Sequence, residues 1–198
     1  MTAKIKLNAA SGGGSFSIQA PSSSSNNRVI TLPDTDDFVL STNRPAFRAR
    51  LAVQTNHSGN PSLVPFDTKD FDLGGCFNAT TSAATLNGIS VPAHSFLPNV
   101  AGTYCISFTA TSNSSTSGTI TQMRALLYKN TDVISTFYQD PKDADPEHIV
   151  SGSGTTIISL NGTSDYIQLK MQMAASGGTL RHLASEGGNV LSAYKLII

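Results

Sequence analysis

Two runs of acidic residues in this sequence could bind a metal ion. The first run, DTKDFD, covers residues 67–72, and the second, DPKDADPEH, covers residues 140–148. Carboxylates gathered on a loop are ligands that Ca²⁺ prefers, but neither run has the central glycine and terminal glutamate of an EF-hand loop. A solvated loop between strands is the simpler explanation of each run. We therefore expect no metal or other cofactor, and Asp140, Asp143 and Asp145 are the candidates if calcium binds.

The histidines do not form a catalytic or zinc-binding motif. His57, His94, His148 and His182 are far apart, and none has a cysteine or another histidine at ligand spacing. Serine is abundant, but the G-x-S-x-G turn that exposes a nucleophilic serine is absent. We expect His94 and His182 to be ordinary strand or loop residues. The sequence predicts a protein that is not an enzyme.

The two cysteines, Cys76 and Cys105, are expected to be free thiols. Cys105 alternates with Tyr104 and Ile106, so it lies on the opposite, polar face of a strand. An inward disulfide would require Cys76 to share that face. A protein that stays in a cytoplasm would also keep its thiols reduced.

The charge balance excludes two large classes of partner. The chain of 198 residues has 13 Lys and Arg and 13 Asp and Glu, so its formal net charge is zero. This balance does not attract nucleic acid or an anionic membrane. No apolar run approaches the roughly 18 residues of a membrane-spanning helix, and the N-terminus lacks the apolar core of a signal peptide. We expect a soluble protein with no membrane insertion and no Sec export.

Short stretches of alternating apolar and polar residues, separated by turn residues, must form the elements that position the acidic residues, histidines and cysteines. Strands at this spacing, with no credible helical run between them, predict an antiparallel sandwich or barrel. Residues 119–130 could equally form a short helix. The expected strands from residue 46 onward are 46–53, 62–66, 71–78, 94–98, 103–112, 119–130, 133–139, 155–160, 165–173 and 189–198.

Period-two alternation identifies the core. Tyr104, Ile106 and Phe108 occupy every second position of one strand, while Cys105, Ser107 and Thr109 form the face on which subunit contacts are expected. A second strand alternates in the same way. The predicted core residues are Tyr104, Ile106, Phe108, Ile167, Leu169 and Met171.

Two other stretches, QMRALLYKN and AYKLII, carry apolar groups on both faces. Strands that are apolar on both faces in a small sandwich indicate a contact between subunits. The candidates for this interface are Leu126, Tyr128, Tyr194, Leu196 and Ile198.

Five blocks of the chain match, in order, the sequence pattern of a known family. They are PAFRARL (45–51), VPFD (64–67), GGCFNATT with SFLPNVAGTYCISFTA (74–81 and 95–110), LLYKNTD (126–132) and ISLNGTSDYIQLKM (158–171). In these blocks residues 45–198 resemble the globular head of the q subunit of complement's first component, a tumour necrosis factor-like jelly roll. The resemblance implies an all-β, antiparallel jelly-roll sandwich and a homotrimer, with residues of the terminal strands lining the three-fold axis.

The chain departs from the family pattern in two places. It ends in NVLSAYKLII, with Tyr194 at an aromatic position, where the family has a glycine-started strand that contains Phe. The family's compact Gly-Asp turn is opened to Gly-Thr-Ser-Asp, which leaves Asp165 at the expected place. These departures bear on which ligand the protein binds more than on its fold.

Residues 1–44 form a separate segment. Its short alternating stretches, at 4–9, 15–20 and 28–33, have too few apolar positions to stabilise a free hairpin, and a disordered tail is the alternative. LNAASGGGSFSIQAPSSSSNNRVITLPDTDDFVLST (7–42) resembles a motif near the start of bacteriophage structural and tail-fibre proteins, especially those of marine phages. Its place ahead of a trimeric jelly roll implies a virion appendage.

Together the two resemblances imply a non-enzymatic bacteriophage virion protein, assembled in the cytoplasm of the host bacterium. The main hypothesis is a trimeric tail fibre or fibre-like appendage. Its residues 1–44 would bind other virion proteins, and its heads would attach by avidity to a glycan or protein of the host surface. A capsid decoration protein that stabilises the phage head is the first alternative, and a secreted lectin or cytokine-like ligand is the second.

Overall fold

The protein divides into two units, Met1–Leu40 and Ser41–Ile198, which are treated separately below. The computed structural model describes residues 4–8, 10–19, 22–23, 25, 44–115, 118–139, 149–184 and 188–196. The expected strand at 28–33 lies outside the described residues. The acidic loop at 140–148, with the calcium candidates Asp140, Asp143 and Asp145, also lies outside them.

The first unit contains one described β-hairpin. Its strands are β1 (Lys4–Asn8) and β2 (Ser15–Gln19). They pair antiparallel in a register that places Ile5 opposite Ile18. Cross-strand partners lie on one face of a hairpin, so this face is apolar, and Ile5, Leu7 and Ile18 are exposed. A two-stranded hairpin is marginally stable in water by itself, so this unit needs a partner.

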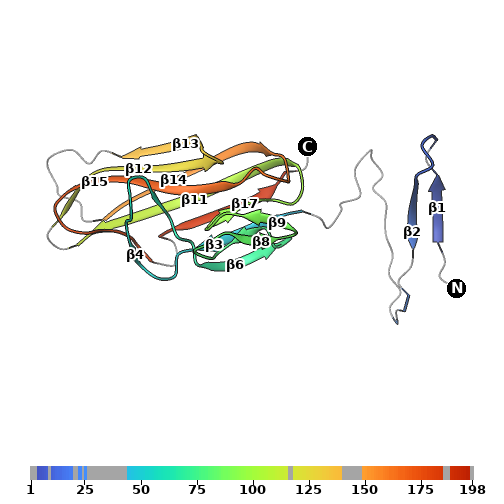
Figure 1. The fold of residues 1–198 in the computed structure, drawn as a ribbon, viewed down its shortest axis with the longest axis horizontal. Coiled ribbons are helices and arrows are strands. Elements are labelled where there is room, and N and C mark those ends of the chain that lie inside the picture. The colour runs from blue at the N-terminus through green and yellow to red at the C-terminus, as the bar shows by residue number, and fades with distance from the viewer. Residues whose placement is uncertain are drawn as a thin grey trace. The chain divides into compact units, whose positions relative to one another are not determined.

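The second unit is a sandwich of two antiparallel sheets (Figure 1). We name each sheet after its central long strand. The β11 sheet contains β4 (Thr55–Asn56), β16 (Leu180–His182), β11 (Gly102–Ser114), β17 (Val190–Lys195), β3 (Ala46–Arg50) and β6 (Thr68–Leu73), with β14 (Ile149–Leu160) on the other side of β11. The β12 sheet contains β13 (Asp132–Gln139), β12 (Thr119–Lys129), β15 (Ile167–Ser176), β10 (Ser95–Phe96) and β7 (Phe77–Asn78), with β5 (Ser62–Leu63) beside β15. A small hairpin of β8 (Ala84–Leu86) and β9 (Ile89–Val91) completes the described strands.

The core lies between the inner faces of the two sheets. Phe47 of β3 stacks on Phe77 of β7 and on Phe96 of β10, with ring centroids 4.6 Å apart in both pairs. Phe96 meets the ring of Tyr104 edge-on, and the Tyr104 hydroxyl donates a hydrogen bond to the carbonyl oxygen of Val100. Aromatic pairs of this kind join one sheet to the other. The six residues expected in the core are all buried: Tyr104, Ile106, Phe108, Ile167, Leu169 and Met171.

The antiparallel all-β architecture expected from the sequence is confirmed. Residues 119–129, for which a helix was the alternative, form a strand because β12 is paired with β13 on one side and β15 on the other. Four elements were not expected, namely β4, β8, β9 and β16. Each has only two or three residues, which is too short for period-two alternation to be visible. In the described part of the chain no helix is long and apolar enough to cross a membrane.

The turn between β14 and β15 is held by the side chain of Asp165. Its carboxylate accepts hydrogen bonds from the Asn130 amide at 3.1 Å and the Asn161 backbone N–H at 3.0 Å, and it forms an ion pair with Lys129 at 3.0 Å. Burial acts to raise the pKa of Asp165, but these donors outweigh it, and the pKa lies below its usual value. This is the turn in which Gly-Thr-Ser-Asp stands in place of the family's Gly-Asp. Through Asp165 it connects the β12–β13 hairpin to β15.

Candidate functional site

The first acidic run, residues 67–72, is already bound by the protein itself. Asp67 accepts hydrogen bonds from two backbone N–H groups just after β3, at 2.8 and 3.2 Å. Asp70 forms ion pairs with Arg48 and Arg50, both on the neighbouring strand β3. These carboxylates therefore stabilise the edge of the β11 sheet.

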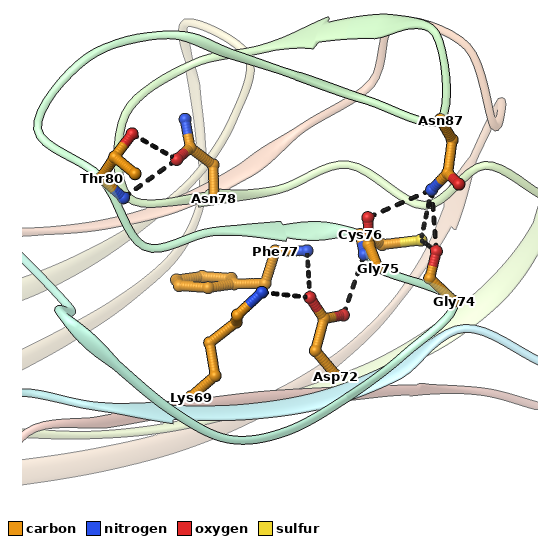
Figure 2. Close-up of polar contacts among 9 residues, drawn as sticks. All are labelled: Lys69, Asp72, Gly74, Gly75, Cys76, Phe77, Asn78, Thr80 and Asn87. Carbon is orange, nitrogen blue, oxygen red and sulfur yellow. Dashed lines mark hydrogen bonds and ion pairs between the residues drawn. The ribbon is translucent and has the colours of Figure 1, made fainter.

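Asp72, the third carboxylate of this run, holds the loop between β6 and β7. It accepts hydrogen bonds from the backbone N–H groups of Cys76 at 2.8 Å and Phe77 at 3.2 Å, and it pairs with Lys69 at 3.1 Å (Figure 2). Because its oxygens are satisfied by the protein, the run does not fit a calcium ion. Within the described part of the chain no group of three or more His, Cys, Asp or Glu could hold a metal.

Two asparagines hold the segments next to Asp72: Asn78 fixes the segment after β7, and Asn87 fixes the β6–β7 loop. The Asn78 side-chain oxygen accepts hydrogen bonds from the backbone N–H and hydroxyl of Thr80, at 2.9 and 2.7 Å (Figure 2). The Asn87 amide donates to the carbonyl oxygens of Gly74 and Gly75 at 2.7 and 3.1 Å (Figure 2). These contacts take up donors and acceptors that a ligand would need. The region around Asp72 is therefore a structural loop anchor.

His57 and His182 form a stacked pair at one end of the sandwich, in which His182 is buried and His57 is half-buried. Their ring centroids are 3.9 Å apart, and their Nε2 atoms lie 3.2 Å from Ser112 Oγ and 3.0 Å from Ser62 Oγ, respectively. Burial lowers the pKa of His57 to about 4, and burial together with the charge of His57 lowers the pKa of His182 to about 3. Both serines are buried, and imidazoles with such low pKa values are weak bases. The Ser–His contacts therefore do not make an activated nucleophile.

The other nucleophilic or basic side chains do not form a reactive site either. His94 is buried, with its Nδ1 2.9 Å from the carbonyl oxygen of Phe66, and His148 lies outside the described residues. Cys76 and Cys105 are both free, as expected. Burial raises the pKa of the Cys76 thiol, which disfavours the reactive thiolate.

The outer face of the β11 sheet carries an apolar row that crosses five strands. The strand registers align Ile157 of β14, Cys105 of β11, Tyr194 of β17, Ala46 of β3 and Leu73 of β6 side by side, and these five residues are the apolar row. Ile157, Leu73 and Tyr194 are 63%, 60% and 53% exposed. Cys105 is buried and Ala46 is half-buried between these three exposed residues. Exposed apolar groups aligned in one row, on a sheet whose other side is the core, indicate a contact surface.

Small hydroxyl side chains fill the rows next to the apolar row. Thr155, Ser107 and Ser192 lie in register across β14, β11 and β17, and Ser107 Oγ is 2.9 Å from Thr155 Oγ1. A shallow groove of about 290 Å³ runs over these rows, with Gly154 and Val190 also in its lining. The side chains beside the apolar row are therefore small, and the backbone of another chain could approach this surface closely.

The outer face of the β12 sheet has a different character. Leu126 is almost fully buried there, although Leu126 has the opposite parity from the core residue Leu127. Lys170 of β15 lies over the ring of Tyr128, 4.4 Å from its centroid, and Arg124 lies over the ring of Tyr138, 5.1 Å from its centroid. This face presents tyrosines and cations together.

The structure thus divides the five interface candidates of the sequence between two sheets. Leu126 and Tyr128 lie on the β12 sheet, whereas Tyr194 lies in the apolar row of the β11 sheet. The backbone N–H of Leu196 donates to the carbonyl oxygen of Thr103, which places Leu196 beside the next row of the β11 sheet. Ile198 lies outside the described residues.

Sequence reasoning did not find Ile157 and Leu73 as parts of this surface. Ile157 is flanked at every second position by Thr155 and Ser159, so it stands alone in a polar strand face, and this isolated apolar residue is the signal that could have identified it. The link from Ile157 to Leu73 depends on the cross-strand registers, which the sequence does not reveal.

Comparison with known proteins assigns the fold. No protein-family model matches the sequence, and no curated protein matches it. A structure of murine APRIL at pH 5.0 is 11% identical with a TM-score of 0.53, and the match covers 77% of this chain and 99% of that chain. A structure of murine APRIL at pH 8.5 is 12% identical with a TM-score of 0.50 and the same coverage. Eiger TNF from S. frugiperda, 11% identical over 78% of this chain and 92% of that chain, has a TM-score of 0.47, and the assignment does not depend on it. At these identities the likeness concerns the fold alone, and the second unit has the tumour necrosis factor-like jelly-roll fold.

Proposed function

We propose that this chain is a non-enzymatic recognition protein whose jelly-roll heads associate as a homotrimer and attach to a surface. The observation that carries the proposal is the apolar row on the outer face of the β11 sheet. The apolar row is a binding surface of this kind, while His182, Asp72 and His94 are engaged in structural contacts.

The apolar row is unfavourable in water unless another surface covers it. Covering such a row returns about 25 cal/mol per Å² of apolar surface removed from water. Closed rings of identical subunits satisfy this requirement when one patch of each subunit meets a different patch of the next. The low hydroxyl rows beside the apolar row supply such a second patch, because Ser107, Ser192 and Thr155 leave space for the side chains of a neighbouring copy.

A trimer would turn weak contacts of single heads into stable attachment. Three linked heads that bind the same surface act at a high effective concentration, so overall affinity rises without tighter individual contacts. This mechanism suits the shallow groove beside the apolar row, because broad and shallow contacts suffice.

Two observations support different locations for this trimer. The resemblance of residues 7–42 to phage structural proteins supports a virion appendage, in which the exposed apolar face of the β1–β2 hairpin binds another virion protein. The fold shared with murine APRIL supports the alternative of a cytokine-like ligand better than it supports a fibre. We carry the virion appendage, with its tail-fibre and capsid-decoration versions, and the cytokine-like ligand as the two candidate functions.

The trimer is tested by measuring the mass of the purified full chain in solution. Light scattering coupled to size exclusion should give three times the 20.7 kDa of one chain, and the mass should stay constant on dilution through the micromolar range. A stable monomer would contradict the proposal.

The location is tested by labelling particles with an antibody against residues 45–198. Label on tails supports the fibre version, and label on the shell, with capsids that burst when the protein is missing, supports the decoration version. Absence from every particle, together with saturable binding of the trimer to animal cells, would support the cytokine-like ligand and exclude the virion appendage.

A further inference from the structure

The outer face of the β12 sheet remains available when the β11 sheet forms the subunit contact. Three long strands, β13, β12 and β15, build this face. Its outward-facing residues include two cations, two tyrosines and two glutamines. We name these six residues the cationic face: Gln122, Arg124, Tyr128, Tyr138, Lys170 and Gln172.

The cations of this face are held by aromatic rings and not by carboxylates. Arg124 lies over Tyr138, its partner in the β12–β13 register, and Lys170 lies over Tyr128. Elsewhere in the described part of the chain, the lysines and arginines of β3, β6 and the end of β12 are paired with aspartates. A ring contact orients a cation but leaves its positive charge unneutralised.

The described strands place no carboxylate beside these two cations. The described parts of β12, β13 and β15 contain one acidic residue, Asp132. Asp132 is in register with Lys129 at the hairpin end, and Lys129 has the opposite strand parity from Arg124 and Tyr128. The described residues of the face therefore carry a net positive charge, although the whole chain has no net charge.

Arg124 and Lys170 are neighbours across the sheet, each reaching toward its own tyrosine, so an extended ligand that carries repeated charges could meet both. In the β12–β15 register Arg124 is opposite Gln172 and Leu126 is opposite Lys170, so Arg124 and Lys170 are diagonal neighbours. Side chains in that relation start about 7–8 Å apart. The Gln172 amide lies between them in register, and the Gln122 amide is 3.4 Å from the Tyr138 hydroxyl.

We propose that the cationic face binds an acidic polysaccharide, a chain of sugars that carries carboxylate or sulfate groups. The flat face offers hydroxyl and amide groups for sugar hydroxyls, ring edges for apolar sugar faces, and two fixed cations for sparse negative charges. β12 and β15 already pair on both sides, but β13 ends the sheet and could add a strand, so an acidic peptide is the competing ligand class that the test must exclude. This inference rests on the proposed attachment function and names its ligand class.

The test measures binding of the full-length trimer to defined polysaccharides at low ionic strength. Oligoalginate carries carboxylates, dextran sulfate carries sulfates, neutral dextran carries no charge, and polyglutamate is the acidic-peptide competitor. The test variant combines Arg124→Gln with Lys170→Gln. The control variant combines Arg181→Gln with Lys6→Gln, which removes the same charge outside the cationic face. Melting temperature and trimer mass establish that both variants fold and assemble.

We expect the wild type and the control variant to bind oligoalginate or dextran sulfate but not neutral dextran. The test variant should bind about tenfold or more weakly, because charged hydrogen bonds contribute more than neutral ones. Whichever of the two acidic polysaccharides binds more tightly identifies the anionic group.

Three results would overturn the inference: equal affinity of the test variant and the wild type, no binding of the wild type to either acidic polysaccharide, or binding of polyglutamate as tight as that of oligoalginate. If the trimer still attaches to cells or particles in any of these cases, the proposed function survives and only the ligand assignment fails. A wild-type protein that is not a trimer would instead contradict the proposed function.

Discussion

At the scale of single residues, the stacked pair of His57 and His182 connects folding to pH. The pKa values of about 4 and about 3 lie below the ordinary value of 6.5, so the folded state keeps both rings neutral. The unfolded chain protonates its histidines below about pH 6.5 and then binds more protons than the folded chain. Stability contributed by the pair is therefore fully present above that pH and is lost as the pH falls toward 3.

We predict that the free energy of unfolding falls between pH 7 and pH 5 because of this pair. The loss from His182 alone should reach about 2 kcal/mol near pH 5, and titration of His57 adds to it. Urea unfolding at several pH values measures it. The variant His182→Gln keeps a partner for Ser62 but cannot titrate, so its stability should depend less steeply on pH, whatever its absolute stability. Parallel pH curves for the variant and the wild type would contradict the prediction.

A second prediction at this scale concerns the anchor Asp72. The variant Asp72→Ala leaves the backbone N–H groups of Cys76 and Phe77 without their acceptor, and should reduce the free energy of unfolding by about 1–3 kcal/mol. The matched control is Asp70→Ala, whose ion pairs with Arg48 and Arg50 are partly exposed and should contribute about 1 kcal/mol or less. Chemical unfolding of both variants gives the comparison, and an equal loss would contradict the role of Asp72.

At the scale of elements, two glycines with the same backbone φ allow the cost of backbone strain to be distinguished from the cost of a clash with neighbouring atoms. Gly88, in the β8–β9 turn, and Gly162, in the turn before β15, both have φ +76°, a left-handed conformation that favours glycine. A side chain at Gly88 would meet open space. One at Gly162 would contact the backbone of Val100 and Ala101, which cannot move aside as a side chain can.

We therefore predict that Gly88→Ala costs about 1 kcal/mol, from the left-handed backbone alone. Gly162→Ala should cost clearly more, because the same strain is joined by a clash between two turns. Thermal unfolding of the two variants measures the difference. If both lose the same stability, the close approach of the two turns contributes nothing, and the packing argument fails.

The elements also show where sequence patterns suffice. The parity of the strand at 103–112 identified Tyr104, Ile106 and Phe108 as inward, because one buried face imposes a period of two on a long strand. The same rule cannot find β4 or β16, since two or three residues contain no period. The stacked pair of His57 and His182 was missed for this reason: these residues meet only because β16 pairs with β4.

At the scale of the whole molecule, the sequence indicated the fold and one residue, Tyr194, of the proposed contact surface. Apolar groups on both faces drew attention to the stretches around Leu126, which is buried, and Tyr194, which is exposed. Their separation onto opposite sheets depends on strand order, which is a long-range property of the fold. Ile157 and Leu73 join Tyr194 only through successive registers, so no local pattern could have grouped them.

The apolar row leads to the prediction that assembly depends on one end of the β11 sheet. Ile157→Asp places a charge at the β14 end of the apolar row that another subunit would cover, and burying an unpaired charge is costly. We expect this variant to shift the trimer to monomer by light scattering at micromolar concentration, with its melting curve measured alongside. Because Ile157 is exposed within one head, the isolated fold should tolerate the change.

The control for this prediction is Val133→Asp, which makes the same change at an exposed apolar position of the β12 sheet. This variant should remain a trimer, because Val133 lies on the sheet that the proposed assembly leaves uncovered. A trimer that survives Ile157→Asp but dissociates with Val133→Asp would move the interface to the β12 sheet and would also remove the face proposed for the polysaccharide. The pair of variants therefore tests the assignment of one sheet to assembly and the other to recognition.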